Sequence, residues 1–147
     1  MYLVSDIEIT YTPKLRISQL PRVTDSYEAY QLLYERWDKG KLQFIEQFKM
    51  LLLNRSNRVL GIYTVSHGGI AGTVVDPRLI FIAALKSCAT SIILAHNHPS
   101  GNMKPSNDDL IITRKLQEAG KLLDIPVLDH LIITSEGYTS LNNEGYL

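Results

Sequence analysis

Two histidines separated by a single residue, His96 and His98, are the side chains whose types and spacing are best suited to chemistry. They follow the short apolar run of residues 91–95, which is typical of an interior strand. Residues two apart on an extended chain point to the same side, so both imidazoles can face one point just beyond the strand. A metal ion is the natural occupant of that point.

Asp109 is the candidate for a third ligand. Catalytic zinc sites commonly use three ligands of the His and carboxylate kind and keep a fourth position open. A helix is predicted to begin at Ser106, and Asp109 in its first turn can reach back to the histidines. A structural interpretation stays open at this point. Ser106 and Asp109 also fit a capping box, and a His-x-His pair can lie in an ordinary surface loop.

The preceding part of the chain predicts a helix and a hairpin. We expect residues 1–22, which contain two prolines, to form an irregular or β-like N-terminal arm that packs on the domain edge. Thr24 is the expected cap of a helix whose apolar residues recur at helical spacing as far as Trp37. Residues 44–53 and 59–66 then have the pattern of two strands joined by turn residues.

Two further helices and two strands complete the prediction. Asp76-Pro77 has the cap and the first-turn proline of a helix start. The buried stripe of this helix is expected to contain Ile80, Phe81, Ala84, Leu85 and Cys88. The helix from Ser106 is expected to bury Ile112, Leu116, Ala119 and Leu123. With strands at residues 91–95 and 127–134, the order predicts an α/β fold, a mixed central sheet flanked by helices.

Composition and charge exclude several classes of protein. At 147 residues, the arm and one domain of residues 23–147 are expected, and a chain of this size buries roughly two-thirds of its unfolded surface. Fifteen basic and fifteen acidic residues balance, so there is no global charge to attract nucleic acid. The single cysteine excludes an internal disulfide and agrees with a reducing compartment. No segment has the pattern of a signal peptide or a membrane span, so we expect a cytoplasmic protein.

The spacing of these residues resembles the JAMM (MPN) metalloprotease domain, in which His-x-His-Pro precedes a spaced Ser and Asp. The matching residues are His96, His98, Pro99, Ser106 and Asp109. Shorter blocks resemble the RadC family within that group: Ser66–Gly69, Val75–Arg78, His96–Gly101, Pro105-Ser106 and Leu128–Ile132. The resemblance covers about residues 22–147. It implies an MPN/JAB, cytidine-deaminase-like architecture and a Zn²⁺ ion held by His96, His98 and Asp109.

The resemblance also implies two residues that act beside the metal. The family has a glutamate at the start of the first sheet strand, and Glu46 matches that position. In the implied mechanism, zinc lowers the pKa of its water toward about 7, Glu46 accepts the proton and hydroxide attacks an amide carbonyl. Ser106 would donate a hydrogen bond to the tetrahedral oxyanion. Without the resemblance, the residues do not distinguish Glu46 from Glu28 or Glu35.

Three other polar residues are placed outside the site. A buried strand histidine bonded to a neighbouring carboxylate or carbonyl is more often structural than a partner of a metal ligand. We therefore expect Asp129 and His130 to have a structural role. His67, beside two glycines, either lines the site or merely ends a strand.

The leading hypothesis is a zinc-dependent hydrolase of the RadC type, a metallopeptidase or isopeptidase acting on a protein or peptide. The alternative is a non-catalytic zinc-bound module that recognises protein or DNA, as the family's association with DNA repair suggests. A third possibility is phosphodiester hydrolysis at the same metal. Many RadC-family members carry an N-terminal helix-hairpin-helix-type region suited to DNA, which the first forty residues lack, and the charge balance does not support DNA association. The sequence predicts no oligomeric state.

Overall fold

The computed structural model describes residues 1–69 and 74–147, and the predicted mixture of helices and strands is present in them. In chain order, the elements are η1 (Ile17–Gln19), α1 (Ser26–Arg36), α2 (Lys39–Leu42), β1 (Gln47–Leu53), β2 (Val59–His67), α3 (Pro77–Lys86), β3 (Ser91–Asn97), α4 (Asn107–Leu122), β4 (Val127–Thr134) and β5 (Gly137–Ser140). Among these helices, none combines the length and the apolar character needed to cross a bilayer.

The strands form one mixed sheet in the order β2-β1-β3-β4-β5. β1 is antiparallel to both β2 and β3, whereas β3 and β4 are parallel and β5 returns antiparallel to β4. The predicted α/β class with a mixed central sheet is therefore confirmed. Because β1 and β3 run in opposite directions, the beginning of β1 lies beside the end of β3.

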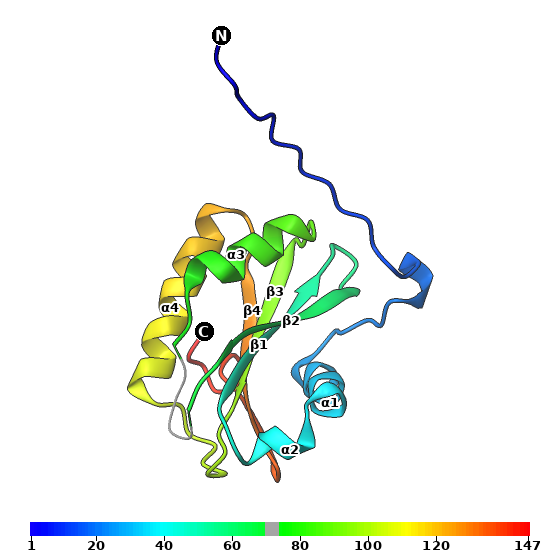
Figure 1. Cartoon of the computed structure of the whole chain (residues 1–147). Coiled ribbons are helices and arrows are strands. Elements are labelled where there is room, and N and C mark those ends of the chain that lie inside the picture. Colours follow the sequence, from blue (N-terminus) through cyan, green and yellow to red (C-terminus); the bar gives the residue numbers. More distant parts are fainter. Residues whose placement is uncertain (70–73) are drawn as a thin grey trace.

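Helices cover both faces of the sheet, with α3 and α4 on one side and α1 and α2 on the other (Figure 1). Strand side chains alternate between the two cores. In β1, Phe48, Met50 and Leu52 pack in the core under α3 and α4. Leu51 and Leu53 pack in the core under α1. β3 is buried along its whole length, as predicted for an interior strand.

The first helix begins one residue later than predicted. Asp25 is its cap, and its Oδ1 accepts a hydrogen bond of 2.8 Å from the Glu28 N–H. Thr24 instead donates through its N–H and its hydroxyl to the Glu28 carboxylate, at 2.7 and 2.8 Å. A further short helix, α2, follows, so β1 begins at Gln47 and not at residue 44.

The predicted buried stripes of α3 and α4 are wrong at their C-terminal ends. α3 ends at Lys86, and Cys88 has a φ of 58°, so its side chain leaves the helical spacing and is exposed. Leu85, in the last turn of α3, is 55% exposed, and Leu123, just after α4, is 41% exposed. An apolar stripe is buried only where a helix overlies the sheet, and the spacing pattern does not show where that overlap stops.

Most of the N-terminal segment does not pack on the domain edge as expected. Residues 1–19 are exposed, and Figure 1 shows them (blue) extending away from the sheet. Backbone contacts with β2 and its preceding turn occur further along. The Pro21 carbonyl accepts a hydrogen bond of 2.8 Å from the Val59 N–H, and the backbones of Arg22 and Arg58 form an isolated antiparallel β-bridge. Proline has no N–H to donate, so this segment is poorly suited to continue as a strand beside β2. The domain boundary at residue 22 stays a prediction.

α4 and the chain leading into β4 approach each other closely at Gly120. The Ile125 N–H donates to the Gly120 carbonyl at 2.8 Å, and a Cβ at Gly120 would lie 2.3 Å from the Ile125 carbonyl oxygen. Gly120→Ala must therefore displace backbone. We expect it to lower the free energy of unfolding by about 1–3 kcal/mol, the usual cost of overpacking, measured by urea denaturation.

Gly61→Ala is the matched control, since a Cβ at this position in β2 meets no atom within 4 Å. We expect the unfolding midpoint of this variant to stay near that of the unaltered chain. Equal midpoints for the two alanine variants would show that the contact at Gly120 does not constrain the fold.

Candidate metal centre

The candidate site lies where the end of β3, the beginning of β1 and the first turn of α4 meet. β3 extends two residues beyond its predicted end, so His96 is within the strand and pairs with Phe48 of β1. His98 follows directly, and its N–H donates to the Ile133 carbonyl at 3.0 Å. Asp109 lies in the first turn of α4.

The three candidate ligands and the candidate base come together. The Nε2 atoms of His96 and His98 are 2.9 Å apart. The two carboxylate oxygens of Asp109 each lie 3.3 Å from one of these nitrogens. Glu46 is slightly further away, with its Oε1 3.8 Å from His96 Nε2. One ligand atom from each residue lies within 4.8 Å of the others, which makes this group able to hold a metal ion.

The spacing and chemistry of these atoms fit a divalent metal. Donor atoms in a tetrahedral zinc site with bonds of about 2.0–2.1 Å are separated by about 3.3 Å, close to the distances among His96, His98 and Asp109. His98 Nδ1 is 2.6 Å from the Asn102 carbonyl, which can only accept, so Nδ1 carries the proton and Nε2 keeps its lone pair. Lone pairs and a carboxylate this close repel one another unless a cation or a proton lies between them.

The surroundings of the cluster shift the pKa values of Asp109 and His98. Burial opposes ionisation of Asp109, but the neighbouring His96 and His98 outweigh it and hold its pKa far below the usual range. For His98, burial favours the neutral form, yet the Asp109 carboxylate and the Asn102 carbonyl raise its pKa above the usual value. Protonation of His98 Nε2 therefore competes with metal binding at that nitrogen.

Glu46 immediately precedes β1 and is held through its backbone. Its N–H donates to the Gly69 carbonyl at 3.1 Å, and its own carbonyl accepts from the Gly68 N–H at 2.7 Å. The side chain is only 12% exposed. Burial raises its pKa, with the nearby His96 and His98 acting in the opposite direction. Glu46 is therefore a carboxylate of increased basicity that faces the cluster.

Ser106 and Asp109 form the capping box that the alternative interpretation predicted. The Asp109 N–H donates to Ser106 Oγ at 3.0 Å, and the Ser106 N–H donates to Asp109 Oδ2 at 2.8 Å. The two interpretations are compatible, because the cap aims the Asp109 carboxylate at the histidines. The Ser106 oxygen accepts within the cap while its O–H can still donate outward, so its catalytic role stays a prediction.

Asn97, between the two histidines, is a residue whose role sequence reasoning missed. It is fully buried and points to the opposite face of the sheet. Its Oδ1 accepts from the Gln47 N–H at 2.7 Å, and its Nδ2 donates to the carbonyls of Leu42 and Ile45 at 2.8 and 2.9 Å. The amide thereby holds the backbone on both sides of Glu46. Only its position between two candidate ligands could have drawn attention to it.

His130 lies next to a candidate ligand, and its expected structural role stays a prediction. Its Nε2 is 2.7 Å from His96 Nδ1, so it contacts a candidate ligand directly. Its Nδ1 is 2.6 Å from Thr113 Oγ1, a residue that sequence reasoning did not consider. Burial, followed by the neighbouring His96, lowers the pKa of His130 well below its usual value, so the ring is neutral. His67 lies outside the cluster, with its Nδ1 2.7 Å from Gln47 Nε2.

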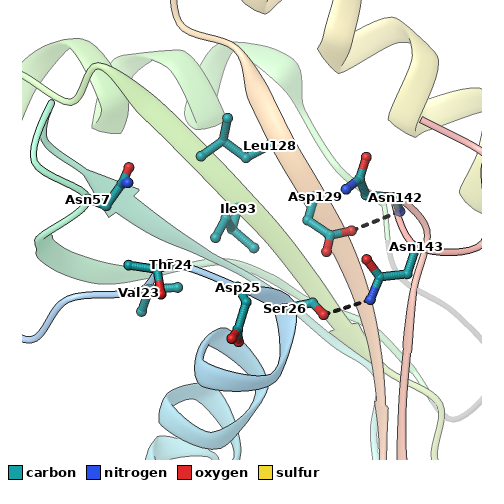
Figure 2. A pocket seen from close by; sticks show the side chains of 10 residues that line it. All are labelled: Val23, Thr24, Asp25, Ser26, Asn57, Ile93, Leu128, Asp129, Asn142 and Asn143. Carbon is teal, nitrogen blue, oxygen red and sulfur yellow. Dashed lines mark hydrogen bonds between the residues drawn. The ribbon is translucent and has the colours of Figure 1, made fainter.

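Asp129, next to His130, faces the other side of the sheet. Figure 2 shows it in a pocket near the start of α1, with its carboxylate bonded to the Asn142 backbone. The pocket has a volume of about 420 Å³. The carboxylate also accepts from the Ser140 hydroxyl at 2.6 Å and the His130 N–H at 2.7 Å. Asp129 therefore organises the turn after β5, and its side chain does not contact the His130 ring.

Comparison with known proteins places the chain in a family. The model of the RadC-like JAB domain matches residues 23–146. Similar relatives are each named "UPF0758 protein", which states no activity. The one from Flavobacterium johnsoniae is 46% identical over 129 residues, 88% of this chain and 55% of the relative. The one from Salinibacter ruber is 49% identical over 102 residues, 69% of this chain and 44% of the relative.

A relative from Methanosarcina mazei is 39% identical over 126 residues, 86% of this chain and 54% of its own length. The chain thus spans about half the length of the curated relatives it matches. The matched range contains all four residues of the cluster as well as the whole sheet. The chain belongs to the RadC-like JAB domain family.

Proposed function

We propose that this chain is a zinc-dependent hydrolase that cleaves an amide bond in a protein or peptide substrate, in the cytoplasm. One observation carries the proposal. A carboxylate with raised basicity, Glu46, faces a set of three donors whose spacing suits one divalent ion. A site that only stabilised the fold would need the three donors and a fourth ligand, but it would not need a buried base beside them.

His96, His98 and Asp109 are the residues that would hold the ion. Two imidazole nitrogens and one carboxylate oxygen form a donor set that suits zinc. When bound there, zinc supplies a Lewis acid that makes water more acidic and polarises the carbonyl of an amide. Glu46 lies further from His96 Nε2 than Asp109 does, at 3.8 against 3.3 Å. This distance favours a role as a base over a role as a fourth metal ligand.

In this proposal, Glu46 moves the proton. Its carboxylate accepts a proton from the attacking water and later delivers it to the amine that leaves. Burial raises its pKa, which brings its basicity closer to neutral pH and makes the return of the proton easier. The backbone bonds to Gly68 and Gly69 hold the residue in place during both transfers.

Ser106 is proposed to stabilise the negative charge that develops on the substrate carbonyl oxygen. It is exposed at the start of α4, and its hydroxyl proton is not used in the capping box. Removal of one such donor typically lowers the rate about a hundredfold or more.

Amide hydrolysis is favoured over cleavage of a phosphodiester. Many nucleases use two metal ions, and the described residues contain one cluster able to hold a metal. The chain also has no net positive charge to attract a polyanion. The alternative function is a zinc-bound module that recognises protein or DNA. It would use the same metal site but would not catalyse a reaction.

The first prediction is that the purified protein binds one zinc ion per chain. His98→Ala removes one of the three donors and is expected to abolish this binding, measured by elemental analysis after zinc is supplied and the excess removed. His67→Ala is the matched histidine control and should keep its zinc, because His67 lies outside the cluster. Absence of zinc from the unaltered chain would refute the proposal.

The zinc affinity should also depend on pH. His98 binds metal only when Nε2 is unprotonated, and its pKa is raised. Protons therefore compete as the pH falls through this raised pKa, at a higher pH than for an ordinary histidine. Competitive titration with a chromophoric chelator at several pH values measures the effect. An affinity independent of pH across this range would mean that His98 is not a ligand.

Glu46→Gln separates catalysis from metal binding. It removes the base while preserving size, so we expect one zinc per chain and a loss of hydrolysis of about a hundredfold or more. The assay incubates the zinc-loaded protein with a peptide library and with single- and double-stranded oligonucleotides, and identifies products by mass spectrometry.

Glu35→Gln, on the exposed surface of α1, is the matched control and should leave the activity unchanged. Loss of zinc from Glu46→Gln would identify Glu46 as a ligand. Cleavage of oligonucleotides alone would replace the amide proposal with a nuclease, and a zinc-loaded chain that cleaves neither class would favour the non-catalytic module.

A further inference from the structure

We propose that Thr113 and His130 act as positioning residues that determine which nitrogen of His96 carries the proton, and so keep His96 Nε2 free for the metal. This inference rests on the proposed metal centre. It assigns a role in metal binding to two residues that do not themselves touch the ion.

Three successive hydrogen bonds determine where His130 and His96 carry their protons. Thr113 Oγ1 donates to the backbone carbonyl of Asp109 at 2.6 Å. A hydroxyl has one proton to donate, so in its 2.6 Å contact with His130 Nδ1 the threonine oxygen must accept. His130 therefore carries its proton on Nδ1.

The proton position on His130 in turn determines the one on His96. A neutral His130 with its proton on Nδ1 has a lone pair on Nε2, which can only accept. The contact of 2.7 Å between His130 Nε2 and His96 Nδ1 thus requires the proton to lie on His96 Nδ1. His96 Nε2 is left with its lone pair directed at the cluster. The chain of bonds begins at the Asp109 backbone and ends at His96, so it joins two of the three candidate ligands.

Burial prevents water from replacing any member of this chain. The exposed fractions of His96, Thr113 and His130 are 1%, 2% and 0%. Phe48 closes one side, with its ring parallel to that of His96 at 6.0 Å and edge-on to that of His130 at 5.3 Å between centroids. Each proton must therefore be placed by a protein partner, because no solvent molecule supplies another donor or acceptor.

Loss of the Thr113 oxygen reverses the preference. With no acceptor near Nδ1, the His130 proton is better placed on Nε2, where His96 Nδ1 can accept it. His96 must then carry its own proton on Nε2, the nitrogen that would bind the metal. A substitution outside the cluster would thus block a ligand by changing its tautomer.

Thr113→Val tests this inference, since valine has the shape of threonine without the hydroxyl. Partners of metal-ligating histidines typically contribute about 10–100-fold to metal affinity, and we expect a loss in that range. The measurement is competitive titration of Zn²⁺ alone against a chromophoric chelator. Thr113→Ser keeps the hydroxyl and should restore most of the affinity.

Thr134→Val is the matched control. Thr134 is also a fully buried threonine, but its hydroxyl donates to the Gly137 carbonyl at 3.2 Å, away from the histidines. Its substitution should leave zinc affinity unchanged. An equal loss of affinity in the Thr113 and Thr134 valine variants would show a general effect of destabilisation and overturn the inference.

A second measurement needs no variant. In metal-free protein with ¹⁵N-labelled histidines, at mildly alkaline pH, the imidazole spectra should show the proton of His96 on Nδ1. A proton on Nε2 would overturn the inference even if zinc binds. Neither readout uses hydrolysis, so a chain that binds zinc and cleaves nothing would refute the proposed activity and leave this inference standing.

Discussion

The pairing of β1 with β3 is the constraint on which the rest of the structure depends. Phe48 lies opposite His96, and the next pair along brings Gln47 beside Asn97. A shift of one residue would turn every side chain of one strand to the other face. The histidines would then point toward α1, and Glu46 would lose its place beside them. Hydrogen bonds between the Asn97 amide and the backbone around Glu46 fix this register.

The same alternation serves both stability and the site. His96 points to the α3 and α4 side, whereas Asn97 points to the α1 and α2 side and donates to the backbone carbonyls of Leu42 and Ile45. One short segment thus supplies a candidate ligand on one face and a structural bond on the other. This dual use couples the position of the cluster to the integrity of the sheet.

The cluster concentrates polar groups at the edge of an apolar core. His98, Asp109 and Glu46 are each less than a sixth exposed, and His96 is almost completely covered. Such groups lose hydration on folding and need partners. The capping box, the Asn102 carbonyl and the bond to His130 supply them. The domain therefore holds its donors in place through its own hydrogen bonds, before any cation contributes.

Local patterns in the sequence predicted the elements and much of the cluster. The two histidines at the end of a buried strand and Asp109 in the first turn of a helix depend on neighbours within one element. The strand at residues 127–134 was predicted with its observed bounds, because its apolar run ends at turn residues. Glu46, about fifty residues before the histidines, was selected only through the resemblance to a family.

The sequence by itself determined the α/β class, the main strands and the spacing of the candidate ligands, because hydrophobic period and capping act over a few residues. The tertiary structure alone decided that Glu46 faces His96, that Asn97 holds β1 and that Thr113 reaches His130. It also decided that Cys88 leaves the core, since the end of α3 depends on what lies beneath it. These outcomes rest on contacts between distant segments, which only the packing of helices against the sheet brings together.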